Sequence, residues 1–174
     1  EDGYRWSIIA TPAETLAGKC GNLDKQKYPK SFINGTKGAY YLTNGSMCSV
    51  DADISILDRV KIESKYHPLS LGGNISNIHL GTAYPEPQAL FDLTKIISKT
   101  DLGFFAYSSI NHYCYDCNTN GKGLIDNCPN CGSRNITCID RVTGYLSTIG
   151  TKTSKSGWNA SKISELNDRK RYNV

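Results

Sequence analysis

Two Cys-x-x-Cys pairs carry the strongest chemical signal in the sequence: Cys114 with Cys117, and Cys128 with Cys131. Each pair can place two thiolates on one metal ion from a tight turn, and two pairs complete the tetrahedral shell that zinc adopts in structural sites. The residues between the pairs include two glycines and suit a short β-hairpin. A shell of four cysteines leaves no open position for a substrate, so the spacing predicts a structural zinc site. Two disulfides or a redox pair are the alternatives.

The other possible ligands and thiols carry weaker signals. His112 is near enough to replace a ligand, although four cysteines suffice, and Cys20, Cys48 and Cys138 are interpreted as ordinary buried or surface thiols. Seven cysteines is an odd count, which does not favour a secreted disulfide scaffold. Metal-type spacing favours a reducing compartment, so we expect a cytoplasmic chain. Five Asn-x-Ser/Thr sites, which matter only in a secreted protein, point the other way: Asn34, Asn44, Asn74, Asn135 and Asn159.

Length and composition limit the classes of protein that fit. A chain of 174 residues predicts one domain or a piece of a larger one. The net charge of +4 is too mild to indicate nucleic-acid binding by itself. No apolar run approaches the roughly 20 residues of a membrane span, so we expect no membrane partner. The N-terminus is acidic and has neither a signal peptide nor an initiator Met, so we expect a processed, excised or fragmentary chain.

The elements that must position these cysteines include one clear βαβ unit. Residues 85–99 have apolar residues at helical spacing, and residues 74–80 and 103–108 read as strands on either side. Such a unit is normally a right-handed crossover in a parallel sheet. Residues 6–10 predict a short buried strand, while residues 54–64 are ambiguous between helix and strand. This βαβ unit, together with the strand at residues 6–10 and the helix start after it, makes about one and a half such units. That is too few to close a barrel, so the α/β part is interpreted as the end of a larger domain.

The stretch "ATPAET" reads as a helix start. Thr11 suits the N-cap, Pro12 the first helical position, and Glu14 the capping box, with Ala13 between them. Residues 21–50 then read as rich in loops. An ordinary capping box is one interpretation; the other is that free amides at the helix start bind substrate phosphate, because a helix N-terminus attracts anions. In the second case Glu14 caps the helix rather than touching phosphate.

The segment "RVTGY", residues 141–145, follows the cysteine pairs and resembles a glycyl radical motif centred on Gly144. With the cysteine pairs and the tail "WNASKISELNDRKRY", it is similar to the C-terminus of the anaerobic (class III) ribonucleoside-triphosphate reductases. Upstream stretches such as "HPLSLGGNIS" and "TDLGFFAYS" resemble that family in the same order. The resemblance covers nearly the whole chain but only the last quarter or so of the family's length. Glycyl radical enzymes of the pyruvate formate-lyase type share the Arg-Val-x-Gly-Tyr core but lack the cysteine pairs and this tail.

The resemblance implies an α/β fold: the C-terminal part of a glycyl-radical-enzyme β/α barrel, a four-cysteine zinc ribbon, and a glycyl radical loop with a C-terminal helix starting near Asn159. The corresponding parts are residues 1–111, 112–138 and 139–174. It also implies that the remainder of the reductase barrel is a partner, that the full enzyme is a homodimer, and that this chain alone is incomplete for catalysis. Substrate phosphates would lie near the strand-to-helix turn at residues 11–14.

The implied reaction is the reduction of ribonucleoside triphosphates to deoxyribonucleotides. A radical S-adenosylmethionine activating enzyme with an iron–sulfur cluster would remove one hydrogen atom from Gly144. The glycyl radical would oxidise a cysteine that is not in this chain to a thiyl, which abstracts the ribose 3′ hydrogen before the 2′ hydroxyl leaves as water. Glycine suits this role because a delocalised Cα radical must be nearly planar, and a Cβ would crowd it. The plainer interpretation of Gly144 is a turn glycine.

The reductant and the rival function stay open at this point. The formate-using branch of the family often has Cys where this chain has Thr143 and His where it has Asn74, and "TNGSM" carries an extra glycine, so formate or a redoxin could be the reductant. The rival hypothesis is a zinc-ribbon module that binds nucleic acid or a protein partner. Eleven tyrosines and a basic tail favour it. Basic residues that do not cluster around the cysteines count against it.

Overall fold

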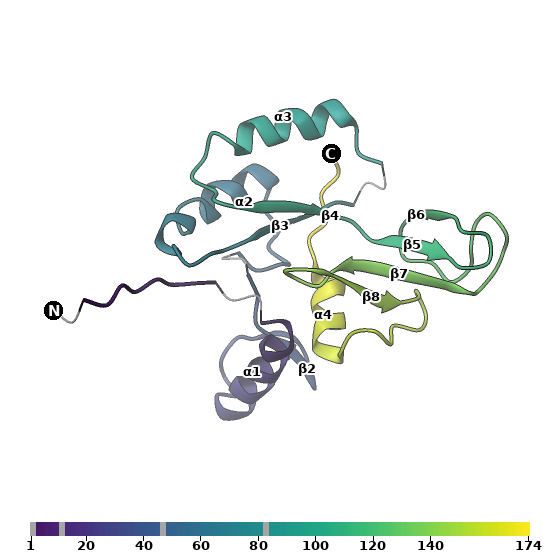
Figure 1. Ribbon diagram of the computed structural model, residues 1–174. Helices are drawn as coiled ribbons and strands as arrows, with labels where there is room; N and C mark the ends of the chain where they lie inside the picture. The colour runs from purple at the N-terminus through teal and green to yellow at the C-terminus, as the bar shows by residue number, and fades with distance from the viewer. Residues whose placement is uncertain (1–2, 11–12, 46–47, 82–83) are drawn as a thin grey trace.

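In the computed structural model, two parallel strands and the helix that connects them form the first of three units, as Figure 1 shows. Strand β3 (Ser76–His79) pairs with β4 (Phe105–Ser108), and helix α3 (Pro87–Ile97) lies across the pair. Pro87 occupies the first turn of α3, and the Glu86 carboxylate caps the helix. The predicted βαβ unit is therefore confirmed. The structure describes residues 3–10, 13–45, 48–81 and 84–174.

The core of this unit contains side chains from the strands, from the helices packed against them and from the end of the chain. Helix α2 (Ile56–Glu63) settles the ambiguity of residues 54–64, and Ser55 caps it by accepting from the Asp58 amide. A single 3-10 turn, η1 (His67–Leu69), follows it. The buried apolar residues of this core are Val60, Ile78, Leu80, Ile97, Leu102 and Tyr172. Burial of apolar surface in this cluster holds the C-terminal tail against β3.

Helix α1 (Glu14–Lys27) and the hairpin of β1 (Asn34–Thr36) and β2 (Ala39–Tyr41) form a second unit. The expectation that loops begin at residue 21 was wrong, because α1 continues for two more turns. Gly21 does not end the helix: a Cβ at this position would lie 2.8 Å from the Tyr41 backbone. The glycine marks close packing of a helix on a strand and not a loop.

An antiparallel sheet in the order β6-β5-β7-β8 forms the third unit. Its strands are β5 (Asn111–Cys114), β6 (Asn120–Lys122), β7 (Ile136–Arg141) and β8 (Leu146–Gly150). The predicted hairpin between the two cysteine pairs was misplaced. The hairpin is made by β5 and β6, so Cys114 ends its first strand and Cys117 lies in its turn.

Helix α4 (Ala160–Asp168) packs beside this sheet and joins the three units, as both views show. The helix starts near Asn159, as expected; Asn159 is its N-cap and accepts a hydrogen bond from the Lys162 amide at 2.9 Å. Asp168 accepts from the Tyr41 hydroxyl at 2.8 Å, and after the helix Tyr172 bridges to Leu80 beside β3. The boundary expected between residues 138 and 139 falls inside β7, and the three-part division stays a prediction.

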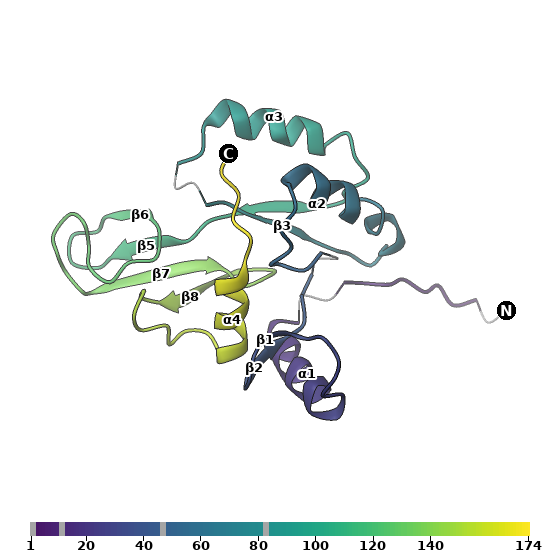
Figure 2. The same ribbon diagram turned by 180° about the vertical axis from the view of Figure 1, so that it is seen from behind.

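The N-terminal segment differs most from its prediction. Residues 6–10 were expected to form a buried strand, but Trp6 is 90% exposed and the segment makes only one isolated parallel bridge, from Ile9 to Gly73. Figure 2 shows the segment extending away from the other elements. The apolar pattern has no neighbouring strand within the described part of this chain to cover it. No helix among the described residues is long and apolar enough to cross a membrane.

Candidate functional site

The two cysteine pairs converge on one point. The sulfur atoms of Cys114, Cys117, Cys128 and Cys131 all lie within 4.8 Å of one another. The Cys114–Cys131 and Cys117–Cys128 sulfur pairs are each 3.6 Å apart. A disulfide would need about 2.05 Å, and all four thiols are free. A tetrahedron with zinc–sulfur bonds of about 2.3 Å has edges of about 3.8 Å, so this cluster is compatible with a zinc site.

Two of the four thiols have a lowered pKa, which favours the thiolate form that a metal requires, whereas neighbouring Cys117 helps to raise the pKa of Cys131. The Thr119 hydroxyl lies 3.0 Å from the Cys117 sulfur, and this hydrogen bond lowers the pKa of the thiol to about 5. The pKa of Cys128 is also lowered, first by a backbone hydrogen bond from Cys131. His112 is not a ligand in this cluster. Its ring contacts the Gly123 carbonyl at 3.3 Å instead.

The three remaining cysteines lie outside the cluster, in agreement with their interpretation as ordinary thiols. Cys48 and Cys138 are buried, and burial raises the pKa of each. Cys20 is half-buried on α1. A raised pKa keeps a thiol protonated and unreactive at neutral pH.

Gly144 lies at the tip of the hairpin formed by β7, β8 and the turn between them, which we call the Gly144 hairpin (residues 136–150). The Val142 amide donates to the Tyr145 carbonyl at 2.9 Å, so Thr143 and Gly144 form a tight two-residue turn. Gly144 and Tyr145 are exposed. The described glycines with positive φ are Gly3, Gly35, Gly38, Gly45, Gly73, Gly123, Gly132 and Gly150. Gly144 is not among them, so a left-handed backbone conformation does not explain this glycine.

The residue before Gly144 is anchored in the interior. Thr143 is 2% exposed, and its hydroxyl accepts a hydrogen bond from the Lys162 ammonium at 3.2 Å. Gly45 packs against it from a distant segment: a Cβ on Gly45 would lie 2.8 Å from the Thr143 methyl group. The tip is thus solvent-facing while its base is tied to α4 and to the segment around Gly45.

Four buried ionic side chains, which we call the charge cluster, fasten β7 to α4. They are Asp140, Lys162, Glu165 and Arg169. Arg169 donates to Glu165 at 2.9 Å and to Asp140 at 3.1 Å, and Lys162 pairs with Glu165. Arg169 also donates to the Val142 carbonyl at 3.1 Å. Two positive and two negative groups compensate one another, which a buried charge requires.

An aromatic and apolar layer completes this support. The Trp158 ring lies 5.4 Å from the Arg169 guanidinium and 5.8 Å from the Lys162 ammonium. The buried apolar residues around it are Val142, Ile149, Trp158 and Leu166. The sequence places Trp158, Lys162, Glu165 and Arg169 in the tail that resembles the family but assigns them no role. Sequence reasoning missed Asp140, whose signal is an acidic residue on the inward face of an alternating strand.

The start of α1 lies beside this hairpin. Thr15 lines a cavity of about 120 Å³ together with Val142, Tyr145 and other residues. Thr11 and Pro12, two of the predicted phosphate-binding residues, lie outside the described residues. The predicted N-cap was wrong, because α1 begins at Glu14 with Ala13 as its N-cap and without a side-chain cap hydrogen bond. The Ala13 amide donates to Asn44 Oδ1 at 3.0 Å.

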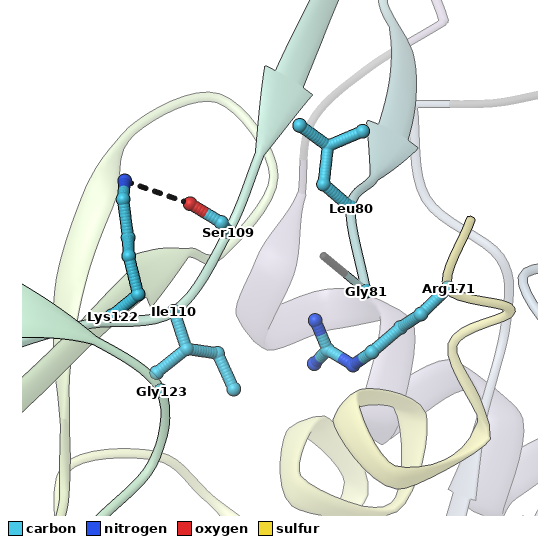
Figure 3. Close-up of a pocket in the computed structure, with 7 residues that line it drawn as sticks. All are labelled: Leu80, Gly81, Ser109, Ile110, Lys122, Gly123 and Arg171. Carbon is cyan, nitrogen blue, oxygen red and sulfur yellow. Dashed lines mark hydrogen bonds between the residues drawn. The ribbon is translucent and has the colours of Figure 1, made fainter. Parts of the chain in front are cut away.

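A different pocket of about 200 Å³ lies past the carboxyl ends of β3 and β4, as Figure 3 shows. Its lining residues are Leu80, Gly81, Ser109, Ile110, Lys122, Gly123 and Arg171. Lys122 is turned toward Ser109, to which it donates at 3.1 Å, and away from Arg171. The two charges do not converge, and neither Gly144 nor the cysteine cluster borders the pocket. We assign the pocket no part in the chemistry.

Comparisons with known proteins agree with this architecture. The model of the family described as anaerobic ribonucleoside-triphosphate reductase matches residues 1–172. The chain is 28% identical over 189 residues to the anaerobic ribonucleoside-triphosphate reductase of Haemophilus influenzae, covering 99% of this chain and 24% of that protein.

Solved structures show the same fold. An anaerobic ribonucleotide reductase is similar with a TM-score of 0.75 at 22% identity, over 99% of this chain and 26% of that one. A crystal structure of the anaerobic ribonucleotide reductase from Thermotoga maritima is similar with a TM-score of 0.66 at 23% identity, over 84% and 23%. The chain spans about a quarter of the length of the curated relatives it matches. It belongs to the anaerobic ribonucleoside-triphosphate reductase family.

Proposed function

We propose that this chain is the radical-bearing C-terminal part of an enzyme that reduces ribonucleoside triphosphates to deoxyribonucleotides. Gly144 is the site of the stored radical. The observation that carries the proposal is an exposed glycine, without a left-handed backbone conformation, at the tip of a hairpin whose base is held by buried charges. A radical site needs such placement, since the tip must enter a barrel while the hairpin keeps its shape.

The remainder of the β/α barrel is the first partner. Here one βαβ unit is present, and the exposed apolar residues of the N-terminal segment have no cover in the described chain: Trp6, Ile8 and Ile9. Neighbouring barrel strands would bury them. That remainder also supplies the cysteine that becomes the thiyl, and the complete enzyme is a homodimer.

The cysteine cluster holds structural zinc in this proposal. It lies at one end of β7 and Gly144 lies past the other end, since Cys114 pairs with Ile136 and Arg141 pairs with Leu146. The metal is therefore assigned to the fold of the sheet that carries the hairpin and not to the reaction. Four cysteine ligands close its coordination shell.

The substrate is assigned to the side of the hairpin where α1 begins. The start of α1 lacks a side-chain cap, and a helix N-terminus attracts phosphate. Residues 11–14 would receive the triphosphate of the ribonucleotide. The cavity lined by Thr15, Val142 and Tyr145 supports this assignment, because it places the helix start next to the hairpin.

Activation requires a separate radical S-adenosylmethionine enzyme that takes one hydrogen atom from Gly144. The exposed Gly144, Tyr145 and Leu146 are the surface that such an enzyme would approach. The reductant is formate or a redoxin. Threonine and asparagine at positions 143 and 74 supply neither a thiol nor an imidazole, and both side chains are engaged within the fold: Thr143 by Lys162, and Asn74 by the His67 carbonyl at 3.0 Å.

The proposal is tested with the enzyme assembled from this chain and the remainder of the barrel. After anaerobic activation it should convert ribonucleoside triphosphates to deoxyribonucleotides. Gly144→Ala should abolish the product, whereas Cys20→Ser, a change in a thiol outside the cluster, should leave it unchanged. Undiminished turnover by Gly144→Ala would rule out the assigned radical site.

A further inference from the structure

The guanidinium of Arg141 contacts both peptide groups that flank Gly144. Its Nη1 donates to the Gly144 carbonyl at 3.2 Å and to the Thr143 carbonyl at 3.4 Å. The Thr143 carbonyl belongs to the peptide group before the Gly144 Cα, and the Gly144 carbonyl belongs to the one after it. A single cationic donor thus touches the two π systems on either side of one Cα.

The backbone of Arg141, at the end of β7, is fixed by the neighbouring Asp140. Its backbone amide donates to Asp140 Oδ1 at 2.7 Å, and the other oxygen of Asp140 is bound by Arg169. Both oxygens of this carboxylate are therefore occupied. Within the described part of the chain no carboxylate lies within ion-pair distance of the Arg141 guanidinium. The hydrogen-bond partners of the Arg141 guanidinium are therefore the two carbonyl oxygens of the turn.

This contact matters for a radical on Gly144. Removal of one hydrogen atom leaves one unpaired electron on Cα, in an orbital that overlaps both flanking peptide groups when they share a plane. The preceding nitrogen donates electron density and the following carbonyl withdraws it. A hydrogen bond from a cation strengthens that withdrawal, because charged donors bind oxygen more strongly than neutral ones.

We propose that Arg141 is a positioning residue for the glycyl radical: it holds the two flanking peptide groups in one plane and draws spin density from Cα toward the carbonyl oxygens. The inference rests on the proposed function of Gly144 and adds a residue that tunes the radical. Arg141 gains and loses no electron, and no bond to it forms or breaks. The guanidinium keeps its charge at every pH at which the protein is folded, and its rigid plane fixes the direction of the Nη1 donor, which a freely rotating lysine ammonium does not.

The test uses the assembled enzyme, activated without oxygen and examined by electron paramagnetic resonance. The coupling to the remaining α-hydrogen reports spin density on Cα, so Arg141→Met should widen the doublet. Electron–nuclear double resonance should detect an exchangeable guanidinium proton in the unsubstituted enzyme, and this coupling should vanish in Arg141→Met. The radical yield should fall roughly tenfold, as expected for loss of one hydrogen bond to a charged group.

Two further variants make the result decisive. Arg141→Lys should restore part of the yield and an altered exchangeable coupling, and it replaces the Met variant if that variant accumulates no radical. Arg134→Met, a change in an exposed arginine near the cysteine cluster, should leave the spectrum unchanged. An unaltered doublet and exchangeable coupling in both Arg141 variants would overturn the inference while leaving the Gly144 assignment intact. Absence of any doublet in the unsubstituted enzyme would instead overturn the proposed function, and the inference with it.

Discussion

The cysteine cluster and the Gly144 hairpin lie at opposite ends of strand β7 and are stabilised in different ways. The cluster takes all four sulfur atoms from a short stretch of chain, Cys114 to Cys131. The hairpin depends on residues far away in the sequence: Arg169 and Lys162 in and after α4, and Gly45 from another unit. A metal site of this kind can form locally, whereas the hairpin needs the whole chain to be folded.

This difference has a consequence for function. Loss of a metal should disorder one end of the sheet, and loss of a buried charge should loosen the other. The two effects can be separated by substitutions at each end, and the expected effects decrease in the order given below.

The largest effect is expected at the cysteine cluster. Cys128→Ser removes one of four thiolates, so the zinc content should fall from about one ion per chain to near zero, since structural sites of this type need all four ligands. Hydrogen exchange should then accelerate across residues 112–138, because such segments fold with their metal. Cys138→Ser, a buried cysteine outside the cluster, is the control and should keep its zinc. Full zinc content in Cys128→Ser would show that the four cysteines do not form the zinc site.

The next effect is expected in the charge cluster. Arg169→Met leaves Asp140 without its main partner, which should lower the free energy of unfolding by about 3–5 kcal/mol. Urea denaturation measures this change. Lys170→Met is the matched control, because its partner Asp53 is 89% exposed and the pair should contribute nothing measurable. Equal losses in the two variants would show that burial of the charges is unimportant.

A smaller effect is expected from packing behind the hairpin. Gly45→Ala adds a methyl group 2.8 Å from the Thr143 side chain at a φ of +75°, which should cost roughly 1–3 kcal/mol. Thermal unfolding is the measurement. Gly103→Ala is the control, since the nearest atom would be 3.7 Å away and its backbone angle is ordinary. Gly45→Ala matching this control in stability would show that the contact is loose.

The smallest effect concerns pH. Burial, with help from nearby Arg169, holds the pKa of His79 well below its usual value of 6.5. Below pH 6.5 His79 binds a proton in the unfolded chain but stays neutral in the folded chain. Its effect on the free energy of unfolding is therefore absent above this pH, and the protein becomes less stable as the pH falls. One unit below it, His79 should cost about 1 kcal/mol. His79→Gln should flatten the dependence of unfolding free energy on pH, and an unchanged slope would refute the assignment.

The same contrast explains what the sequence could predict. Cysteine spacing and helical periodicity are local patterns, so the convergence of the four cysteines and the helix α3 could be predicted, as could a C-terminal helix starting near Asn159. The charge cluster could not be derived, because Asp140 and Arg169 meet only after β7 and α4 are packed. The start of α1 was misplaced by two residues: the helix begins at Glu14, and the Ala13 amide before it donates to Asn44 from a distant loop. The exposure of Trp6 was missed because a strand-like apolar pattern does not say which neighbouring strand will cover it.

The central claim is that Gly144 carries the radical, and isotopic substitution tests it most directly. In the assembled enzyme, anaerobic activation should give a doublet in the electron paramagnetic resonance spectrum, from the one α-hydrogen left on Gly144. Protein grown with α-deuterated glycine should show the doublet collapsed to a single line, because the deuterium coupling is far weaker, and Gly144→Ala should show no signal. A doublet that survives Gly144→Ala, or that is unaffected by deuterated glycine, would contradict the account.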